Sequence, residues 1–492
     1  MRPRTGSFAL VTLALVLTHP ALVRRAVAGD AQQAVMQEIL DVLRQNQQIT
    51  DEQHRDLSRK VRQAGEADRA AAQARTVEKV ERVEAVQDIQ TGGPVERVEK
   101  VEVVEEKKPA PDTLRAYWKD GPRFETADKS FRLGLIGRIQ NDWAIIDSSR
   151  ALRDELGIDA FQSGTEFRRA RIGIEGDVYG DFAFKFEVDF AGGEVAFKDM
   201  YLAARNVPYI QNVRVGHFKE PFSLEQLTSS VNITFMERSL ADVFTPERNT
   251  GIAIHPTYFD ERLTWSVGAF RETDDSGTGF GDKQNYDIAT RLTGLPWYAD
   301  DGAQLVHLGF SYVHSFRNGV ETEIRQRPES HLAERFVDTG PFLANDNDRI
   351  NPELAVVYGP ASLQAEYMRV FVDAPEVDDP AFDGWYAYLS YFLTGEHRAY
   401  KTSAAAFDRV RPKRNFGFGP DAGWGAFEVG ARYSKIELDS GDVQGGNLGD
   451  TTLGLNWYLN PNMRIMANYV YSARTDTAGS ANIYQSRFQI VW

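Results

Sequence analysis

Histidine is the first residue type to test for chemistry, because imidazole serves both as a metal ligand and as an acid–base group. The histidines beyond the N-terminal apolar run are His54, His217, His255, His307, His314, His331 and His397. They show no HExxH or other ligand spacing, and the chain has no GxSxG, Walker A or GxGxxG motif. The absence of cysteine excludes disulfides, thiolate metal sites and cysteine nucleophiles. We therefore predict no enzyme, no metal site and no cofactor.

Arginine is the other residue type that could act on a solute, since its guanidinium stays charged and meets anionic oxygens bidentately. The stretch FRRARIGIE places arginines among residues that alternate in polarity. If its apolar positions face lipid, Arg169, Arg171 and Glu175 face the opposite side of a strand. Arg168 then falls on the lipid-facing parity, where a mid-depth arginine costs roughly 2–4 kcal/mol. We expect Arg168 to lie at a rim or a bulge.

The stretch from Thr165 to Gly251 indicates what kind of element carries these residues. In Asp181–Phe190 the apolar side chains alternate with Lys185, Glu187 and Asp189, which is the period of a strand. Aromatic residues on one face and charges of both signs on the other suit a barrel wall between lipid and water. The residues that follow, about 221–249, lose the alternation and form a longer loop than a hairpin needs.

Composition agrees with a closed sheet better than with soluble domains. The 492 residues have a mean hydropathy of −0.42, and no apolar run downstream of the N-terminus has the length of a membrane helix. Membrane-spanning β-strands are not detected by this test, because apolar and polar residues alternate along them. The net charge of −15 argues against a nucleic-acid partner, which would need a basic surface.

The first 111 residues separate into three segments. Residues 1–28 read as a secretory signal, with an apolar run and an Ala-Val-Ala site before Gly29, although Arg24 and Arg25 also allow a cut after Ala21. Residues 29–75 have helical spacing that suits a coiled coil used for oligomerisation or tethering, or a solvated spacer, with a cap near Thr50 separating two helices. Residues 76–111 are a charged low-complexity linker, either a stiff helix or an extended chain.

Residues 112–492 read as strand after strand, which predicts the fold class. Strand-like runs alternate with turn signals, and the spacing gives roughly 16 strands, an even number as bacterial barrels favour. Two Gly-rich and charged stretches, Asp275–Lys283 and Lys401–Gly425, resemble extracellular loops. We predict an all-β transmembrane antiparallel barrel with an N-terminal helical extension in the periplasm.

The C-terminus gives the sharpest indication of this class. Tyr484, Phe488, Ile490 and Trp492 share one face of a strand, and the chain stops on an aromatic residue. Such an ending resembles the signature of outer-membrane barrels. The partners it predicts are outer-membrane lipid and the barrel-assembly machinery, which would bind the C-terminal strand.

A series of segments in order along the barrel resembles the phosphate-selective porin O and P family. They are GRIQNDW, FRRARIGIEGD, VGHFKEPFSLEQLTSS, FMERSL, YGPASLQAEY, GWYAYLSYFLTGEHRAYK and LGLNWYLNPN, from about Phe124 to Trp492. The resemblance implies a 16-stranded barrel, a homotrimer, and an anion pathway lined by arginines above a constriction made by the third loop.

By motif match, the resemblance implies particular residues. The anion-pathway candidates are Arg138, Arg168, Arg169, Arg238, Arg325 and Arg327. The constriction-loop candidates are Phe222, Glu225, Gln226 and Glu237, and further cation candidates are Lys198, Lys219 and Lys401. The alternative for each arginine is an ordinary charge paired with a neighbouring carboxylate.

Departures from the family pattern leave the solute open. Gln226 stands where the phosphate porin has a lysine, Lys198 followed by Asp199 stands at its site aspartate, and Glu323 and His331 interrupt the arginine run. The leading function is passive diffusion of small anions, phosphate among them. The alternatives are a general or cation-preferring pore, a barrel-anchored envelope tether that uses the N-terminal helices, and a barrel-embedded enzyme such as a lipid hydrolase.

Overall fold

The computed structural model describes residues 41, 44, 50–51, 53–60, 79–82, 86–87, 94–95, 101–104, 113–280, 285–420 and 422–492. The chain divides into two compact units, residues 1–110 and 111–492. The predicted signal peptide, residues 1–28, lies outside the described residues. In the part of the chain that is described, no helix has the length and apolar character needed to cross a membrane.

The first unit has a capped helix and short strands. Thr50 Oγ1 accepts from the backbone N–H of Gln53, whose side chain accepts from the N–H of Thr50, so the predicted cap at Thr50 is confirmed. Helical residues 53–60 follow. In the low-complexity segment, β1 (Lys79–Arg82) pairs with β4 (Val101–Val104), and β2 (Val86–Gln87) pairs with β3 (Pro94–Val95).

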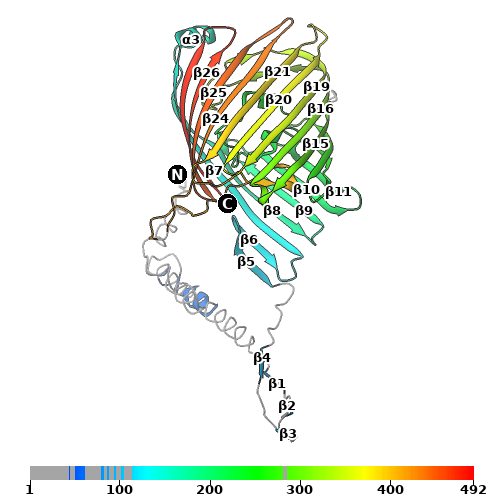
Figure 1. The fold of residues 1–492 in the computed structure, drawn as a ribbon, viewed down its shortest axis with the longest axis vertical. Coiled ribbons are helices and arrows are strands. Elements are labelled where there is room, and N and C mark those ends of the chain that lie inside the picture. The colour runs from blue at the N-terminus through cyan, green and yellow to red at the C-terminus, as the bar shows by residue number, and fades with distance from the viewer. Residues whose placement is uncertain are drawn as a thin grey trace. The chain divides into compact units, whose positions relative to one another are not determined.

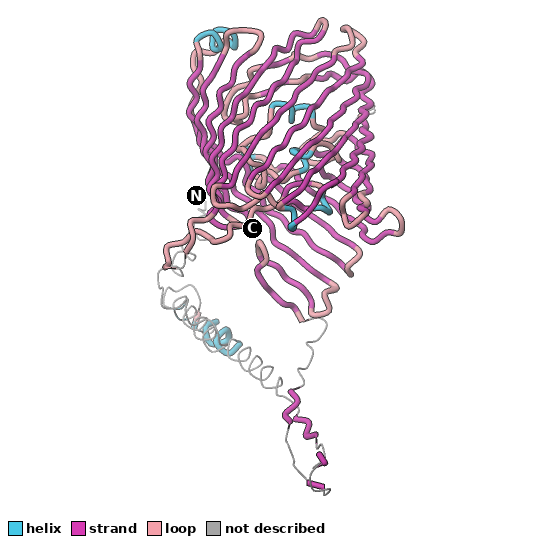
Figure 2. The backbone as a smooth tube through the Cα atoms, viewed as in Figure 1, coloured by secondary structure: helices cyan, strands magenta, loops and turns pink. Residues whose placement is uncertain are grey.

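The second unit is a closed antiparallel barrel of 16 strands among the described residues (Figures 1 and 2). The barrel closes where β27 pairs with β7. This confirms the predicted fold class and strand number. The strands are β7 (Phe131–Ser148), β8 (Gly164–Val178), β9 (Phe182–Asp189), β10 (Ala196–Val207), β11 (Gln211–Lys219), β12 (Arg248–Ile254), β14 (Leu263–Arg271), β15 (Tyr286–Ala299), β16 (Gln304–Thr322), β19 (Phe342–Tyr358), β20 (Ala361–Asp373), β21 (Ala381–Phe392), β24 (Ala426–Ser440), β25 (Val443–Asn460), β26 (Met463–Arg474) and β27 (Ser480–Val491).

The alternation in sequence decides which side chains face outward. On β9, Phe182 and Phe186 are exposed on the outer wall, whereas Glu187 and Asp189 are buried inside. On β27, Tyr484 and Phe488 are exposed and Arg487 is fully buried. The outer wall is therefore a band of exposed apolar side chains. Such a surface is unfavourable in water and is typical of a barrel surrounded by lipid.

The connections differ between the two ends of the barrel. At the end that carries the C-terminus they span residues 179–181, 208–210, 255–262 with β13 (Thr257–Tyr258), 300–303 with η4 (Asp300–Gly302), 359–360, 393–425 and 461–462. We call this the turn end. At the other end, the loop end, they span 149–163 with α3 (Arg150–Leu156), 190–195 with η2 (Ala191–Gly193), 220–247, 272–285, 323–341, 374–380, 441–442 and 475–479.

The expectation that Asp275–Lys283 and Lys401–Gly425 both resemble extracellular loops cannot hold, because they join strands at opposite ends of the barrel. The second stretch belongs to the connection between β21 and β24, which lies at the turn end together with the short turns. Successive connections alternate between the two ends of an antiparallel barrel, so the number of preceding strands decides the end. The length and composition of one connection taken singly do not decide its end.

A hairpin made of β5 (Leu114–Trp118) and β6 (Pro122–Thr126) extends the wall at the turn end. β6 pairs with the first residues of β7 just beyond the point where β27 stops. The terminal Trp492 fills the junction, with its N–H donating to the carbonyl of Gly137 and its carbonyl accepting from the N–H of Gly137, both at 3.0 Å. The C-terminal strand is thus paired up to its last residue.

Replacing Gly137 with valine should weaken barrel closure. A Cβ atom at Gly137 would lie 2.2 Å from an indole carbon of Trp492, so the indole must leave its place. Overpacking of this kind costs about 1–3 kcal/mol. We expect a lower midpoint in thermal unfolding followed by heat-modifiable electrophoretic migration. Gly294→Val is the matched control, because nothing lies within 4 Å of a Cβ at Gly294; equal midpoints for the two variants would contradict the prediction.

The barrel interior divides into an apolar part and a polar part. Strands β19, β20, β21, β24, β25 and β26 contribute buried apolar side chains that pack against η3 (Leu240–Phe244) and against Phe336 and Val337 of loop 323–341. Charged residues of β7 to β12 line the remaining space. Loops that fold inward therefore fill one part of the lumen and leave the other to water.

Candidate functional site: a cationic chamber inside the barrel

Three segments enter the lumen and determine what space remains. The inner loop, residues 220–247, contains α4 (Leu224–Leu227) and η3. The rim loop, residues 323–341, contains β17 (Arg325–Gln326) and β18 (Val337–Asp338). The turn-end loop, residues 393–420 and 422–425, contains β22 (Tyr400–Lys401), η5 (Thr402–Ala404) and β23 (Ala406–Phe407). The inner loop is visible behind the front wall in Figure 2.

The inner loop is held across the lumen by charged residues of the wall. The carboxylate of Glu366 on β20 accepts from the N–H groups of Leu224 and Glu225, at 3.0 and 2.7 Å, so the first turn of α4 receives a negative charge. Further along the wall, Arg464 of β26 donates to the carbonyls of Ile233 and Thr234. These bonds to two separate wall strands fix the path of the loop.

Arginines gathered around Glu237 complete this attachment. Arg168 meets the Glu237 carboxylate with two hydrogen bonds of 3.1 Å, and Arg487 of β27 meets it at 2.6 Å. Arg169 lies 4.0 Å from the same carboxylate and donates to the side-chain oxygen of Gln140. Arg487 also binds Asp142 at 2.6 Å, so three guanidinium groups share two carboxylates and one positive charge is left in excess.

The expectation for Arg168 is confirmed. Gln140 of β7 pairs with Arg169 of β8, but the next residue, Asn141, pairs with Phe167. Arg168 is therefore left without a partner in the ladder and forms a β-bulge. The bulge turns both arginines into the lumen. A second shift on β10 lies between Phe197 and Met200, and the two residues between them, Lys198 and Asp199, also line the lumen. Each bulge places two consecutive charged residues where strict alternation would allow one.

The wall and the inner loop enclose a polar chamber of about 320 Å³. Its lining has nine cationic side chains and three carboxylates among the described residues. The cations are Arg138, Arg168, Arg169, Arg171, Lys185, Lys198, Lys219, Arg238 and Arg248, and the carboxylates are Asp189, Asp199 and Glu247. A chain with a net charge of −15 thus collects positive charge at one place in its interior.

Ion pairs orient several of these cations, including pairs with carboxylates behind the lining: Arg138 with Glu187 at 2.9 Å and Arg238 with Asp242 at 3.7 Å. The cations still outnumber the carboxylates. Asp199 is shared by Lys185 at 2.8 Å and Arg248 at 2.9 Å. Arg171 pairs with Asp189 at 2.7 Å. Peptide oxygens also hold two cations: the ammonium of Lys219 donates to the carbonyl of Gln226, and Arg238 donates to the carbonyls of Glu225, Gln226 and Thr228 in addition to its ion pair with Asp242. Carbonyl dipoles position a cation and leave its charge to act on a solute.

A second polar cavity, of about 330 Å³, adjoins the chamber. The two share Lys198, Glu247 and Arg248, which therefore lie at their junction, here called the throat. The second cavity is also lined by residues 272–275 of a loop-end connection, and Asp275 lies 3.4 Å from the ammonium of Lys198. A solute that passes between the cavities must pass the cations Lys198 and Arg248 and the carboxylate of Glu247.

The turn-end loop is anchored in the lumen by buried polar contacts. Arg291 of β15 binds Glu353 with bonds of 2.9 and 2.7 Å and donates to the carbonyl of Ala405 at 3.0 Å. His307 shares hydrogen bonds with Glu353 and with the hydroxyl of Tyr400. Near the hairpin of β5 and β6, a 2.6 Å hydrogen bond from Arg411 holds the pKa of Asp120 below its ordinary value.

The structure brings most of the sequence-predicted residues to the chamber. Arg138, Arg168, Arg169, Arg238, Lys198, Lys219 and Gln226 line it. Glu237 binds its arginines, Glu225 is buried and accepts from Ser239 and Arg432, and Phe222 is buried in the apolar core. Arg325 and Arg327 lie in the rim loop, and Lys401 is exposed in the turn-end loop.

Three lining cations, Arg171, Lys185 and Arg248, were not among the predicted site residues. The alternation of polar and apolar residues places Arg171 and Lys185 on the lumen side of their strands, so the sequence does contain a signal for these two residues. Arg248 has no comparable signal, since it follows the irregular inner loop. Its position depends on where that loop returns to the wall.

The comparisons with known proteins each match about three quarters of the chain. The model of the family described as "Phosphate-selective porin O and P" matches residues 135–492. The chain is 28% identical over 403 residues to Porin O of Pseudomonas aeruginosa, covering 74% of this chain and 88% of that protein. It is 29% identical over 377 residues to an uncharacterized protein of Caulobacter vibrioides, covering 74% and 72%. Among solved structures, an anion-selective porin from Comamonas acidovorans aligns with a TM-score of 0.46 and 14% identity, covering 74% of this chain and 100% of that one.

Proposed function

The chain belongs to the phosphate-selective porin O and P family and is an outer-membrane porin, and from that premise we propose that it conducts small anions through the cationic chamber. The observation that carries the proposal is the lining of nine cations against three carboxylates. An anion in the chamber exchanges water for several fixed positive groups in series, so no single group holds it. Inorganic phosphate is the solute class that guanidinium groups suit best.

We propose that the turn end faces the periplasm, because short turns lie on that side of outer-membrane barrels. The extension of residues 29–111 precedes β5 and would lie in the periplasm. The family resemblance supports a homotrimer, which native mass spectrometry of the detergent-solubilised protein tests. No catalytic step is part of this proposal.

Single-channel recording of the purified protein in planar bilayers tests the conduction. In a potassium chloride gradient, we expect the reversal potential to show anion preference, because the chamber lining is cationic. Added inorganic phosphate should reduce the chloride current, because phosphate competes for the same guanidinium groups. A cation-preferring reversal potential would overturn the proposal and favour the general pore. Anion preference with no response to phosphate would overturn only the phosphate assignment.

A further inference from the structure

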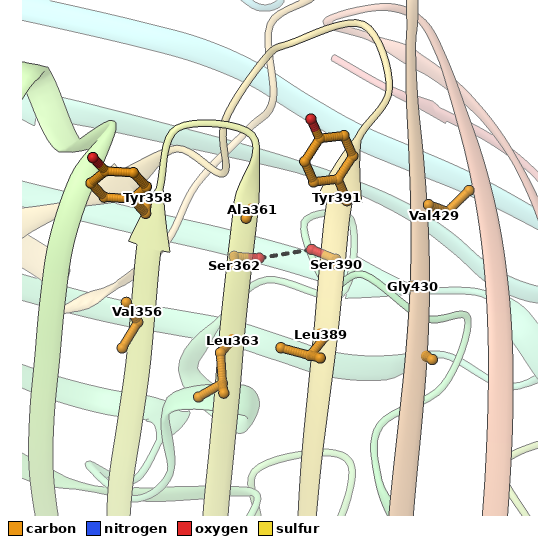
Figure 3. A pocket seen from close by; sticks show the side chains of 11 residues that line it. Val356, Tyr358, Ala361, Ser362, Leu363, Leu389, Ser390, Tyr391, Val429 and Gly430 are labelled. Atoms are coloured by element: carbon orange, nitrogen blue, oxygen red, sulfur yellow. Dashed lines mark hydrogen bonds between the residues drawn. The ribbon is translucent and has the colours of Figure 1, made fainter.

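An apolar slot lies on the outer wall of the barrel, away from the chamber. Tyr358, Ala361, Tyr391 and Val429 pair in one row across β19, β20, β21 and β24. All four positions have the outward parity of their strands, so two tyrosine rings flank the methyl group of Ala361 (Figure 3). Strands two places apart are roughly 9–10 Å from each other. The small residue therefore leaves a space between the rings that is wide enough for a hydrocarbon chain.

The next outward row continues the slot toward the middle of the wall. Val356, Leu363, Leu389 and Ala431 pair across the same four strands. Figure 3 shows the leucines below the tyrosine rings, and the cavity they line is about 580 Å³. On the lumen side, the hydroxyls of Ser362 and Ser390 form a 2.7 Å hydrogen bond that belongs to the wall behind the slot. The slot is open only toward the membrane.

Aromatic residues beside the slot indicate the depth at which it lies. Phe427 of β24 stacks on Trp457 of β25 with ring centroids 5.6 Å apart, and Phe416 of the turn-end loop packs on the same tryptophan at 4.9 Å. Trp424 of this loop is 77% exposed. Tryptophan and tyrosine collect at the boundary between hydrocarbon and head groups. The two tyrosines of the slot are therefore placed at the head-group boundary of the turn-end leaflet.

A cation stands beyond the slot on the same side of the barrel. Tyr391 is the last outward residue of β21, and the chain then turns at residues 393–395, where Leu393 is exposed and the N–H of Gly395 donates to the carbonyl of Phe392. The ammonium of Lys413 donates to the carbonyl of Gly395, and the Lys413 side chain is exposed. Glu396 accepts from the backbone N–H of Lys413. An apolar slot, two phenol hydroxyls and an ammonium thus follow one another toward the turn end.

We propose that this slot is a binding site for one glycerophospholipid of the turn-end leaflet, with an acyl chain between Tyr358 and Tyr391 and its phosphate toward Lys413. The order of the groups matches the order of hydrocarbon, ester and phosphate in such a lipid. Because lipid tails are as apolar as the slot, the gain over bulk lipid comes from van der Waals packing between the two rings and from contact of the phosphate with Lys413. Bulk lipid covers the rest of the wall, where the rows do not hold an alanine between two tyrosines in this way.

Native mass spectrometry of the full-length protein with added dioleoylphosphatidylglycerol tests the site. The wild-type protein should retain one lipid per chain at concentrations where further adducts are weak. Ala361→Trp fills the slot and should reduce this adduct about tenfold, because the acyl chain loses its packing between the two tyrosine rings. Ala269→Trp places the same side chain at an exposed alanine on β14, outside the slot, and should leave the adduct unchanged.

A second variant keeps the test valid if the tryptophan disturbs folding. Tyr391→Ala removes one wall without adding bulk and should also weaken the adduct, and Lys413→Ala should weaken it by reducing the contact with phosphate. Equal adducts in Ala361→Trp, Tyr391→Ala and Ala269→Trp would overturn the proposal. A change in oligomeric state caused by Ala361→Trp alone would also overturn it, because the slot would then be a contact between copies of the chain.

Discussion

Replacing Arg432 with methionine is expected to release the inner loop and raise the single-channel conductance several-fold. Arg432 of β24 is almost completely buried and lies 3.1 Å from Glu225 of the inner loop and 2.5 Å from Glu329 of the rim loop. It also donates to the carbonyl of Glu237 at 2.9 Å and lies over the ring of Phe235. One guanidinium thus joins both loops to the wall.

The size of this effect follows from the two carboxylates that would be left behind. Removing one partner of a buried ion pair costs about 3–5 kcal/mol, because the other charge stays in a site without water. Glu225 and Glu329 are both buried, so both lose their countercharge at once. The least costly response is for the loops to leave the wall and regain water, which widens the pathway and exposes residues 220–247 to protease.

Conductance in planar bilayers and limited proteolysis measure the two consequences. Arg262→Met is the control, because Arg262 is an exposed arginine at the turn end whose guanidinium, among the described residues, donates to the carbonyl of Tyr298 and joins neither the inner loop nor the rim loop to the wall. Surface substitutions of this kind change stability by about 0.5 kcal/mol or less. Wild-type conductance together with wild-type protease resistance in Arg432→Met would show that the loops are held by other contacts.

Reversing the charge at Lys198 is expected to give the largest change in ion selectivity. Lys198 lies at the throat, and its one described carboxylate partner, Asp275, is exposed on a loop. Lys198→Glu changes the charge there by two units with little loss of packing. A unit charge at 4 Å contributes about 1 kcal/mol in water and more in a narrower, less polar space. The permeability ratio of anion to cation should therefore fall roughly tenfold or more.

Reversal potentials in a low-salt gradient measure this ratio, since salt screens the effect. Lys401→Glu is the comparison, because Lys401 is exposed on the turn-end loop and does not line the chamber. We expect it to shift the ratio much less. Equal shifts for the two variants would mean that net charge, and not the throat, sets the selectivity. No shift for Lys198→Glu would place the pathway elsewhere.

The sequence by itself determined the wall of this protein. Alternation has a period of two residues and is a local property, so Phe182, Glu187 and Arg487 could be assigned to their faces without any knowledge of their partners. The cost of a lipid-facing arginine was enough to predict the bulge at Arg168. The aromatic C-terminal strand and the run of strand-like segments likewise depend on short stretches of chain, and each of them is confirmed.

Only the tertiary structure decided what the charged residues inside the wall do. Arg171 and Arg487 look alike in sequence, since both face the lumen, yet Arg171 lines the chamber and Arg487 holds the inner loop. The difference depends on partners such as Glu237, which lies 250 residues from Arg487 along the chain. No local pattern encodes where an irregular loop crosses the lumen, because its path is set by many such distant contacts together. Local sequence patterns are therefore enough to predict the wall, whereas the chamber forms only when distant contacts hold the loops inside the lumen.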